Sequence, residues 1–201
     1  MGRQIAERLA IVGYGIVVDH FRDPDGAQRT LELVRAAGSD GWAFDADVGS
    51  SEELDALFAK IAGSGMRLEV LVNNAAVQTF APLMELSEQD WDRTIRTNLK
   101  GTFLCTQRAA KLMQSTGGAI VNIGSGANRI PFPSLGDYAA SKGGIEMLTK
   151  VAAIELGKLR YESTASHREP LRTSELSGRV PTTVLPGAES RHWDASARKA
   201  M

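Results

Sequence analysis

Short apolar runs and segments of helical spacing alternate along the chain from residue 16 to about residue 157. The apolar runs predict buried strands at 15–20, 41–48, 68–76 and 119–123. The segments of helical spacing predict helices at 2–10, 24–37, 50–65, 87–114 and 138–157, with Ser51 leading a capping box. Strands this apolar are typical of parallel sheets that helices cover on both faces. The pattern therefore predicts an α/β fold with right-handed crossovers.

The pattern changes near Lys158. Residues 159–201 contain no apolar run and no clear period of 2 or 3.6, and Ser, Thr, Arg and Glu dominate them. Such a composition predicts a poorly ordered segment. We therefore divide the chain into a domain at 2–158 and a tail at 159–201.

Composition narrows the class of protein. The 23 Lys and Arg residues nearly balance the 24 Asp and Glu residues, so neither nucleic acid nor a membrane surface is an expected partner. No run of about 18 apolar residues is present, and the first ten residues lack the apolar core of a signal peptide. The single cysteine, Cys105, fits a reducing compartment. We expect a cytoplasmic protein, and the scattered histidines predict no metal site.

The strongest chemical pattern is Tyr138-x-x-x-Lys142, preceded by Ser125 thirteen residues before the tyrosine. Residues four apart share one face of a helix, so Tyr138 and Lys142 are expected to project together from a helix that begins near Asp137. Ser125 follows the strand at 119–123. A phenol, an ammonium and a hydroxyl would then converge at the carboxyl end of a strand, where open α/β sheets bind ligands.

Three further motifs precede Ser125 and Tyr138-x-x-x-Lys142 in a fixed order: Asp47-Val48, Asn73-Asn74-Ala75-Ala76, and Asn98 in RTNLKGTF. With them, residues 2–158 resemble the short-chain dehydrogenase/reductase family. The resemblance implies a Rossmann-like, doubly wound parallel sheet. It also implies an NAD(P)-dependent oxidoreductase that interconverts a small-molecule carbonyl and a secondary alcohol by hydride transfer.

The same resemblance assigns catalytic roles. Tyr138 would be the general acid/base, and Lys142 would favour the phenolate and bind the nicotinamide ribose. Ser125 would donate a hydrogen bond to the carbonyl oxygen, and Asn98 would hold a proton-relay water.

The resemblance also implies a cofactor site. Asp47 and Val48 would contact the adenine edge, and the small residues Asn74, Ala75 and Ala76 would pass under the cofactor. Asp19 near the end of the second strand of the family would suit the ribose hydroxyls of NAD, and Arg22 the 2′-phosphate of NADP. Because both are present, the choice stays open, with a slight preference for NADP.

Two departures separate the chain from the family pattern. Gly2 matches the last glycine of the phosphate-binding turn, so the sheet is expected to be incomplete, without the first strand and the strands after residue 158. With freely chosen third bases, Tyr161 to Pro170 can be encoded so that a shifted reading gives Arg-Ile-His-Cys-Ile-Ala-Pro-Gly-Ala, which resembles the family. We therefore expect out-of-frame translation from about residue 159.

Two alternatives to an active enzyme follow from these departures. These alternatives are an inactive remnant of such an enzyme and an assembly partner of intact family members. In the family, helices corresponding to about 83–115 and 138–157 commonly build dimers and tetramers, so a homo-oligomer is expected.

Overall fold

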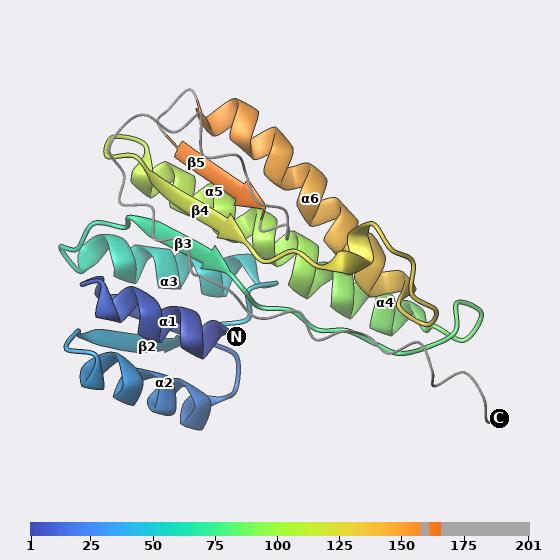
Figure 1. Cartoon of the computed structure of the whole chain (residues 1–201), viewed down its shortest axis with the longest axis horizontal. Helices are drawn as coiled ribbons and strands as arrows, with labels where there is room; N and C mark the ends of the chain where they lie inside the picture. The colour runs from blue at the N-terminus through green and yellow to red at the C-terminus, as the bar shows by residue number, and fades with distance from the viewer. Residues whose placement is uncertain (158–160, 166–201) are drawn as a thin grey trace, which may run out of the picture. The chain divides into compact units, whose positions relative to one another are not determined.

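Helices and parallel strands alternate along the chain, as the apolar pattern predicts (Figure 1). The structure is a computed structural model that describes residues 1–157 and 161–165, all within one compact unit. Its elements are α1 (Gly2–Ile11), β1 (Ile16–His20), α2 (Pro24–Ala36), β2 (Gly41–Asp45), α3 (Ser51–Gly63), β3 (Val70–Asn73), α4 (Glu88–Thr94), the π-helix η1 (Ile95–Lys100), α5 (Gly101–Met113), β4 (Gly118–Asn122), the 3₁₀ turn η2 (Gly126–Asn128), α6 (Gly136–Gly157) and β5 (Tyr161–Ala165).

The described strands form two separate parallel sheets. β1 pairs with β2, and β3, β4 and β5 pair in that order. Figure 1 shows β3, β4 and β5 side by side. Among the described residues, no strand joins β1 to β3, so the expected gap in the sheet lies between these two strands.

Helices cover both faces of β1. Ile16 and Val18 pack with Ala10 of α1 and Val34 of α2, whereas Val17 packs in a larger cluster that α3 and α5 dominate. Successive side chains of a strand point to opposite faces, so the two clusters mark the two faces of the sheet. The larger cluster contains Leu54, Leu57, Phe58, Ile61, Leu104, Cys105, Ala109, Ala110, Met113 and Ile120. The packing role expected for Cys105 agrees with its place in this core.

Side-chain oxygens cap α2, α3 and α4, with one difference from the expected pattern. The helix α3 is capped by Ser50, whose hydroxyl accepts from the Glu53 N–H at 3.3 Å, and not by Ser51. The Glu53 carboxylate accepts instead from the Asp47 N–H at 2.8 Å. The capping box was read one residue late because Ser50 and Ser51 are adjacent and both suit an N-cap.

The long helix expected at 87–114 is divided by the π-helix η1. A π-turn holds an extra residue, so it shifts the faces of the helical segments on either side of it. Asn98 lies within this turn and is fully buried.

The expectation that no strand follows residue 158 is wrong, because β5 pairs with β4 over five positions. Its sequence, YESTA, has no apolar run, and the backbone ladder to β4 gives it the strand conformation without one. The other predictions for the tail, including poor order and out-of-frame translation, concern mostly residues 158–160 and 166–201, which lie outside the described residues. No helix of the described residues is long and apolar enough to cross a membrane.

Candidate active site

Tyr138 and Lys142 lie on the same side of α6, as their spacing predicts. The Lys142 Nζ is 5.6 Å from the centroid of the Tyr138 ring. The same Nζ donates a hydrogen bond of 2.6 Å to the carbonyl of Ile123, immediately after β4. The lysine therefore joins the first turns of α6 to the carboxyl end of the strand.

Ser125 lies two residues beyond this carbonyl and caps the short turn η2. Its Oγ accepts a hydrogen bond of 3.2 Å from the Ala127 N–H. Because the oxygen is the acceptor in this contact, the hydroxyl proton remains available for donation. Ser125 thus lies in the loop after β4, and Tyr138 and Lys142 lie in the first turns of α6, which Lys142 joins to the end of β4.

Burial changes the acidity of Lys142. Only 3% of this residue is exposed, and desolvation lowers the pKa of its ammonium below the usual 10.5. One of its three N–H donors binds Ile123, which leaves two for other acceptors. A nearby negative charge would offset the desolvation and favour the protonated form.

Asn98 clamps the loop after β3 to the helices. Its Oδ1 accepts from the Val77 N–H and its Nδ2 donates to the Val77 carbonyl, both at 2.8 Å. The Nδ2 also donates to the Ser141 Oγ of α6 at 3.0 Å. The side chain therefore acts as a structural bridge, and its expected role in holding a water stays a prediction.

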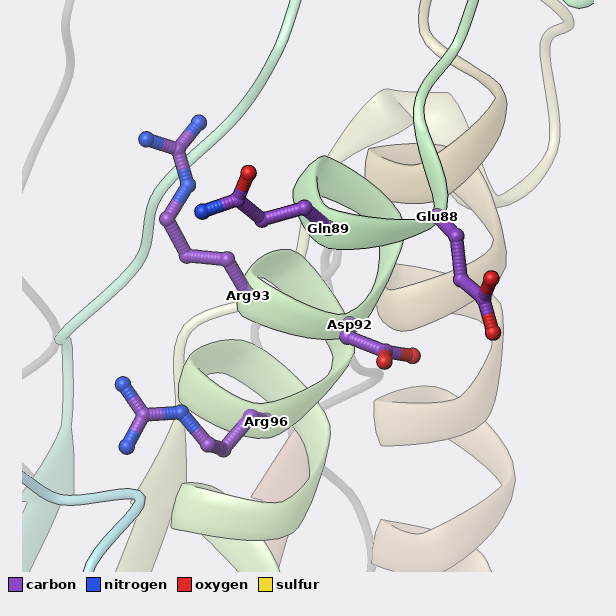
Figure 2. A pocket seen from close by; sticks show the side chains of 5 residues that line it. All are labelled: Glu88, Gln89, Asp92, Arg93 and Arg96. Carbon is purple, nitrogen blue, oxygen red and sulfur yellow. The ribbon is translucent and has the colours of Figure 1, made fainter.

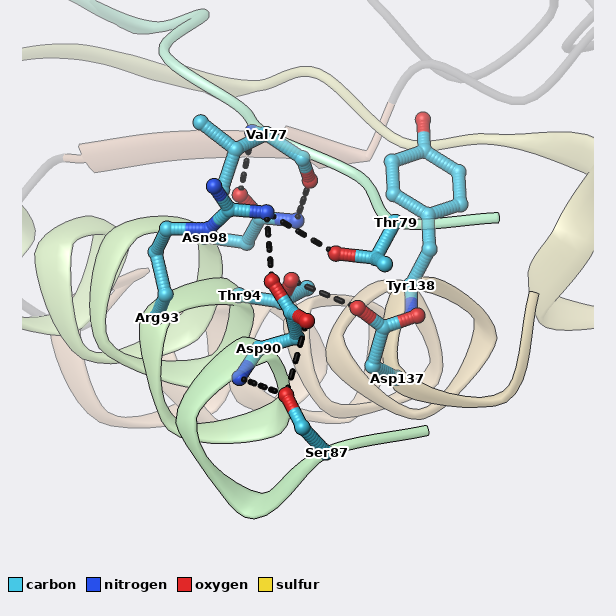
Figure 3. A network of polar contacts seen from close by, with 9 residues as sticks. All are labelled: Val77, Thr79, Ser87, Asp90, Arg93, Thr94, Asn98, Asp137 and Tyr138. Carbon is cyan, nitrogen blue, oxygen red and sulfur yellow. Dashed lines mark hydrogen bonds and ion pairs between the residues drawn. The ribbon is translucent and has the colours of Figure 1, made fainter. Parts of the chain in front are cut away.

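A second buried contact fixes the start of α6. The Thr94 hydroxyl donates to Asp137 Oδ2 at 2.6 Å, and both residues are fully buried. The other carboxylate oxygen accepts from the Tyr138 N–H at 2.7 Å. Figure 3 shows the Tyr138 ring pointing away from this cluster, with its hydroxyl at the far end. The network thus holds the backbone of Tyr138 while its hydroxyl projects outward.

Five of the residues expected to bind a cofactor line one cavity of about 1020 Å³: Gly2, Asp19, Val48, Asn74 and Ala75. Gly2 lies so close to Asn74 that a Cβ on the glycine would stand 2.8 Å from the asparagine Nδ2. The cavity is as large as the sites that hold small molecules and cofactors. The N-terminus of α1 borders it, and its N–H groups have no side-chain cap.

Asp19 lines this cavity and has a pKa well above the usual value of an aspartate. Its side chain is accessible from the open edge of β1, yet surrounding protein atoms desolvate it, and this desolvation, with the nearby Asp45 carboxylate, raises its pKa to about 7.

The remaining expected cofactor residues lie outside the lining of this cavity. Asp47 accepts from the Gly49 N–H at 2.8 Å and pairs with Arg96 at 2.8 Å. Arg22 has a positive φ of 54°, and its guanidinium lies 4.9 Å from the centroid of the Phe21 ring. Ala76 is exposed in the loop after β3. Contacts of these three with a cofactor stay predictions.

A second hollow, of about 580 Å³, lies along α4 and is lined by Glu88, Gln89, Asp92, Arg93 and Arg96 (Figure 2). Its arginines already have partners, because Arg93 pairs with Asp90 at 3.0 Å and Arg96 pairs with Asp47. It contains none of the residues expected to bind a cofactor, so the cavity at β1 and β3 is the better candidate for a cofactor site. The described residues contain no cluster of three or more His, Cys, Asp or Glu that would suit a metal ion.

Sequence reasoning missed Ser141, Thr94 and Asp137, which position the catalytic candidates through hydrogen bonds. All three are fully buried. The sequence does contain a sign of two of them. Asp137 and Ser141, which directly precede Tyr138 and Lys142, are polar residues on a helix face that is otherwise mostly apolar. Their partners lie more than forty residues away, and spacing alone does not reveal such pairs.

Parallel strands, helices on both faces and polar groups at the strand ends define a Rossmann-like α/β protein. The chain belongs to the short-chain dehydrogenase family, whose model matches residues 1–162. It is 38% identical over 157 residues to the 3-oxoacyl-[acyl-carrier-protein] reductase FabG of Staphylococcus aureus, a match of 78% of this chain and 64% of that protein. It is 36% identical to 3beta-hydroxysteroid dehydrogenase 1 of Eggerthella lenta, over 77% of this chain and 60% of that protein.

Solved structures agree with this assignment. A metagenomic short-chain oxidoreductase in complex with NADP superposes with a TM-score of 0.77 at 31% identity, covering 80% of this chain and 73% of that one. The predicted family and the predicted incomplete Rossmann-like fold are thereby confirmed. The chain spans less than two thirds of the length of the FabG proteins that it matches.

Proposed function

We propose that this chain carries the site of an NAD(P)-dependent oxidoreductase that interconverts a small-molecule carbonyl and a secondary alcohol. The observation that carries the proposal is the Lys142 Nζ, which lies 5.6 Å from the Tyr138 ring while it binds the carbonyl at the end of β4. A bound nicotinamide would supply or accept the hydride. FabG and the hydroxysteroid dehydrogenase, by their names, act on carbonyl or alcohol groups, which supports this reaction class.

In this proposal Tyr138 exchanges a proton with the substrate oxygen, because its hydroxyl projects from the helix start. Lys142 favours the phenolate by its charge and offers its two remaining donors to the cofactor ribose. Ser125 donates a hydrogen bond to the substrate oxygen and keeps its proton. Asn98 acts through the clamp on Val77 and Ser141, which positions α6 against the loop after β3.

The cofactor proposed is NADP or NAD. Support comes from the cavity that collects Gly2, Asp19, Val48, Asn74 and Ala75, and from the NADP complex of a structural relative. The uncapped N–H groups of α1 suit the pyrophosphate. Asp47, Arg22 and Ala76 do not line the cavity, and in this proposal they contact the cofactor at its margin.

The decisive experiment is a titration with NADPH and NADH, followed by nicotinamide fluorescence, and by turnover on a panel of ketones. Tyr138→Phe is expected to abolish turnover while it leaves nucleotide affinity within about twofold, because the hydroxyl alone is removed. Thr116→Val, which also removes a single hydroxyl but at an exposed residue outside the lining of the cavity, is the control and should retain activity. Retained turnover in Tyr138→Phe would remove this residue from the mechanism, and nucleotide binding without turnover would favour the inactive remnant.

Self-association is the proposed assembly. Met147, Val151 and Ile154 are spaced by four and three residues along α6, and their exposed fractions are 59%, 43% and 70%. An exposed apolar stripe of this kind favours a protein contact. Ile154→Lys should shift the protein to the monomer in sedimentation velocity, whereas Glu155→Lys should not. An unchanged oligomeric state in Ile154→Lys would contradict this use of α6.

A further inference from the structure

Two side chains of α6 hold the loop after β4 at points on either side of Ser125. Before the serine, the carbonyl of Ile123 accepts a hydrogen bond from the Lys142 Nζ at 2.6 Å. After the serine, the Asn128 Nδ2 donates to the Glu146 Oε2 at 2.5 Å. Glu146 follows Lys142 by four residues, so it lies one helical turn further along α6. The serine is thus held between two anchors on one helix.

The turn η2 connects the second anchor to Ser125. The Ser125 Oγ accepts from the Ala127 N–H at 3.2 Å, and the Ser125 carbonyl accepts from the Asn128 N–H at 3.4 Å. Asn128 therefore binds the serine through its backbone and Glu146 through its side chain. The turn packs against α6, and Ala127 within it is buried. A displacement of the Asn128 side chain would consequently move Ser125 as well.

Burial distinguishes the bond to Asn128 from the other contacts of Glu146. The Glu146 side chain is 15% exposed, whereas the two cations beside it, Arg129 at 3.6 Å and Lys150 at 2.7 Å, are 54% and 57% exposed. Ion pairs with exposed cations contribute little to stability. A hydrogen bond to an ionised acceptor in a partly buried place is stronger. The bond from Asn128 is therefore the contact that anchors the loop.

The amide of Asn128 depends on this one bond. Its Oδ1 is buried and has no hydrogen-bond partner within the part of the chain that the structure describes. A carboxylate accepts hydrogen bonds and does not donate them, so the Nδ2 is the atom that faces Glu146. Removing the Glu146 carboxylate would therefore release the Asn128 side chain from α6.

We propose that Glu146 is a positioning residue for the proposed reaction, on which this inference rests. Through Asn128 it holds Ser125 where the serine hydroxyl donates to the substrate oxygen. Glu146 itself contacts neither the substrate nor the cofactor. Its effect is expected to be large because a misplacement of about 1 Å in an active site can reduce the rate by roughly 10²-fold.

The kinetic test uses the full chain and measures kcat for ketone reduction at saturating NADPH. Glu146→Ala should lower kcat by at least about tenfold, but by no more than Ser125→Ala, for which the loss of a donor costs about 10²–10³-fold. The Kd for NADPH should stay within about twofold, because the cofactor contacts are unchanged. Glu146→Gln keeps an acceptor for Asn128 and should retain kcat within about threefold. Lys150→Ala removes an ion pair but leaves the Asn128 bond, so this matched control should retain the wild-type kcat.

A double-mutant cycle shows whether Glu146 acts through Ser125. Residues that act as one unit have non-additive effects. The variant that combines Ser125→Ala with Glu146→Ala should therefore have the kcat of Ser125→Ala alone. Asn128→Ala removes the same hydrogen bond from its other end, so it should lower kcat as much as Glu146→Ala does. It also replaces Glu146→Ala in the cycle if that variant does not fold.

Amide hydrogen exchange, followed by NMR without nucleotide, tests the anchor without turnover. Glu146→Ala should speed exchange at Ala127 and Asn128, the two amides that bond to Ser125, by at least about fivefold. Glu146→Gln should leave both rates near those of the wild type. The amides of Ala119 and Ile123, which take part in the pairing of β4 with β3, are the internal reference and should not change.

Three kinetic results would overturn the proposal. An unchanged kcat in Glu146→Ala would exclude the role, and an equal loss in the Ser125→Ala background would show that Glu146 does not act through the serine. An equal loss in Glu146→Gln and Glu146→Ala would assign the effect to charge. A wild-type chain without turnover would refute the proposed function, and exchange would then decide the anchor alone: unchanged rates at Ala127 and Asn128 in Glu146→Ala would reject it.

Discussion

The clamp made by Asn98 allows a quantitative test of how the site is held. The side chain is fully buried and takes part in hydrogen bonds with the Val77 N–H, the Val77 carbonyl and the Ser141 hydroxyl. Asn98→Ala removes all three contacts. At about 1 kcal/mol for each bond, we expect the free energy of unfolding to fall by roughly 3 kcal/mol.

A loss of that size is measurable. Whole-domain stability is about 5–15 kcal/mol, and for a chain of this length 3 kcal/mol corresponds to a fall in Tm of roughly 6–12 °C. Urea denaturation followed by far-UV circular dichroism would give the free energy, and Gln89→Ala, an exposed amide on α4, is the matched control. We expect the control to change stability by no more than about 0.5 kcal/mol.

Asn98→Asp adds a pH-dependent test. The ionised carboxylate cannot donate to the Val77 carbonyl, whereas the protonated acid can. Burial should raise the pKa of the new carboxyl, so the stability of this variant should be highest at acidic pH and fall as the pH rises through that pKa. A cost below about 1 kcal/mol in Asn98→Ala, or a stability of Asn98→Asp that does not depend on pH, would refute the clamp.

Two further changes test buried or crowded charges. Lys142→Met should raise Tm near neutral pH, because desolvation lowers the pKa of the native lysine, so its buried charge destabilises the folded protein. This increase in Tm should become smaller as the pH approaches 10.5, where the lysine is also neutral in the unfolded chain. An increase in Tm that does not depend on pH would contradict this reasoning. Asp19→Asn should raise Tm at about pH 8 and have little effect near pH 4. The reason is that the pKa of Asp19 is raised from 3.8 to about 7 in the folded protein. The stability that this carboxyl contributes is fully present below pH 3.8 and is lost as the pH rises through 7. Equal effects of Asp19→Asn on Tm at both pH values would contradict the raised pKa.

The sequence predicted most of the fold because its apolar runs are short and alternate with segments of helical spacing. The expected helix at 24–37 is observed at Pro24–Ala36, and the expected strand at 119–123 is observed at Gly118–Asn122. The shared face of Tyr138 and Lys142 also follows from helical spacing alone. These features depend on local periodicity, which a sequence displays directly.

Features that depend on distant partners were not predictable in the same way. The sequence RTNLKG has ordinary helical residues, and Asn98 within the π-turn bonds to Val77 and Ser141, which lie 21 and 43 residues away in the sequence. β5 was missed because backbone pairing, and not an apolar run, defines it. The buried pair of Thr94 and Asp137 spans 43 residues and leaves no periodic signal.

The π-turn between α4 and α5 has a consequence for how this segment can vary. An extra residue in a helix rotates everything beyond it by about 100°. Thr94 before the turn faces α6, while Leu104 and Cys105 after it pack in the core with α3. Deleting a single residue from Ile95–Lys100 would restore a uniform helix but turn one of these faces away from its partner. Insertions and deletions should therefore be far rarer here than substitutions.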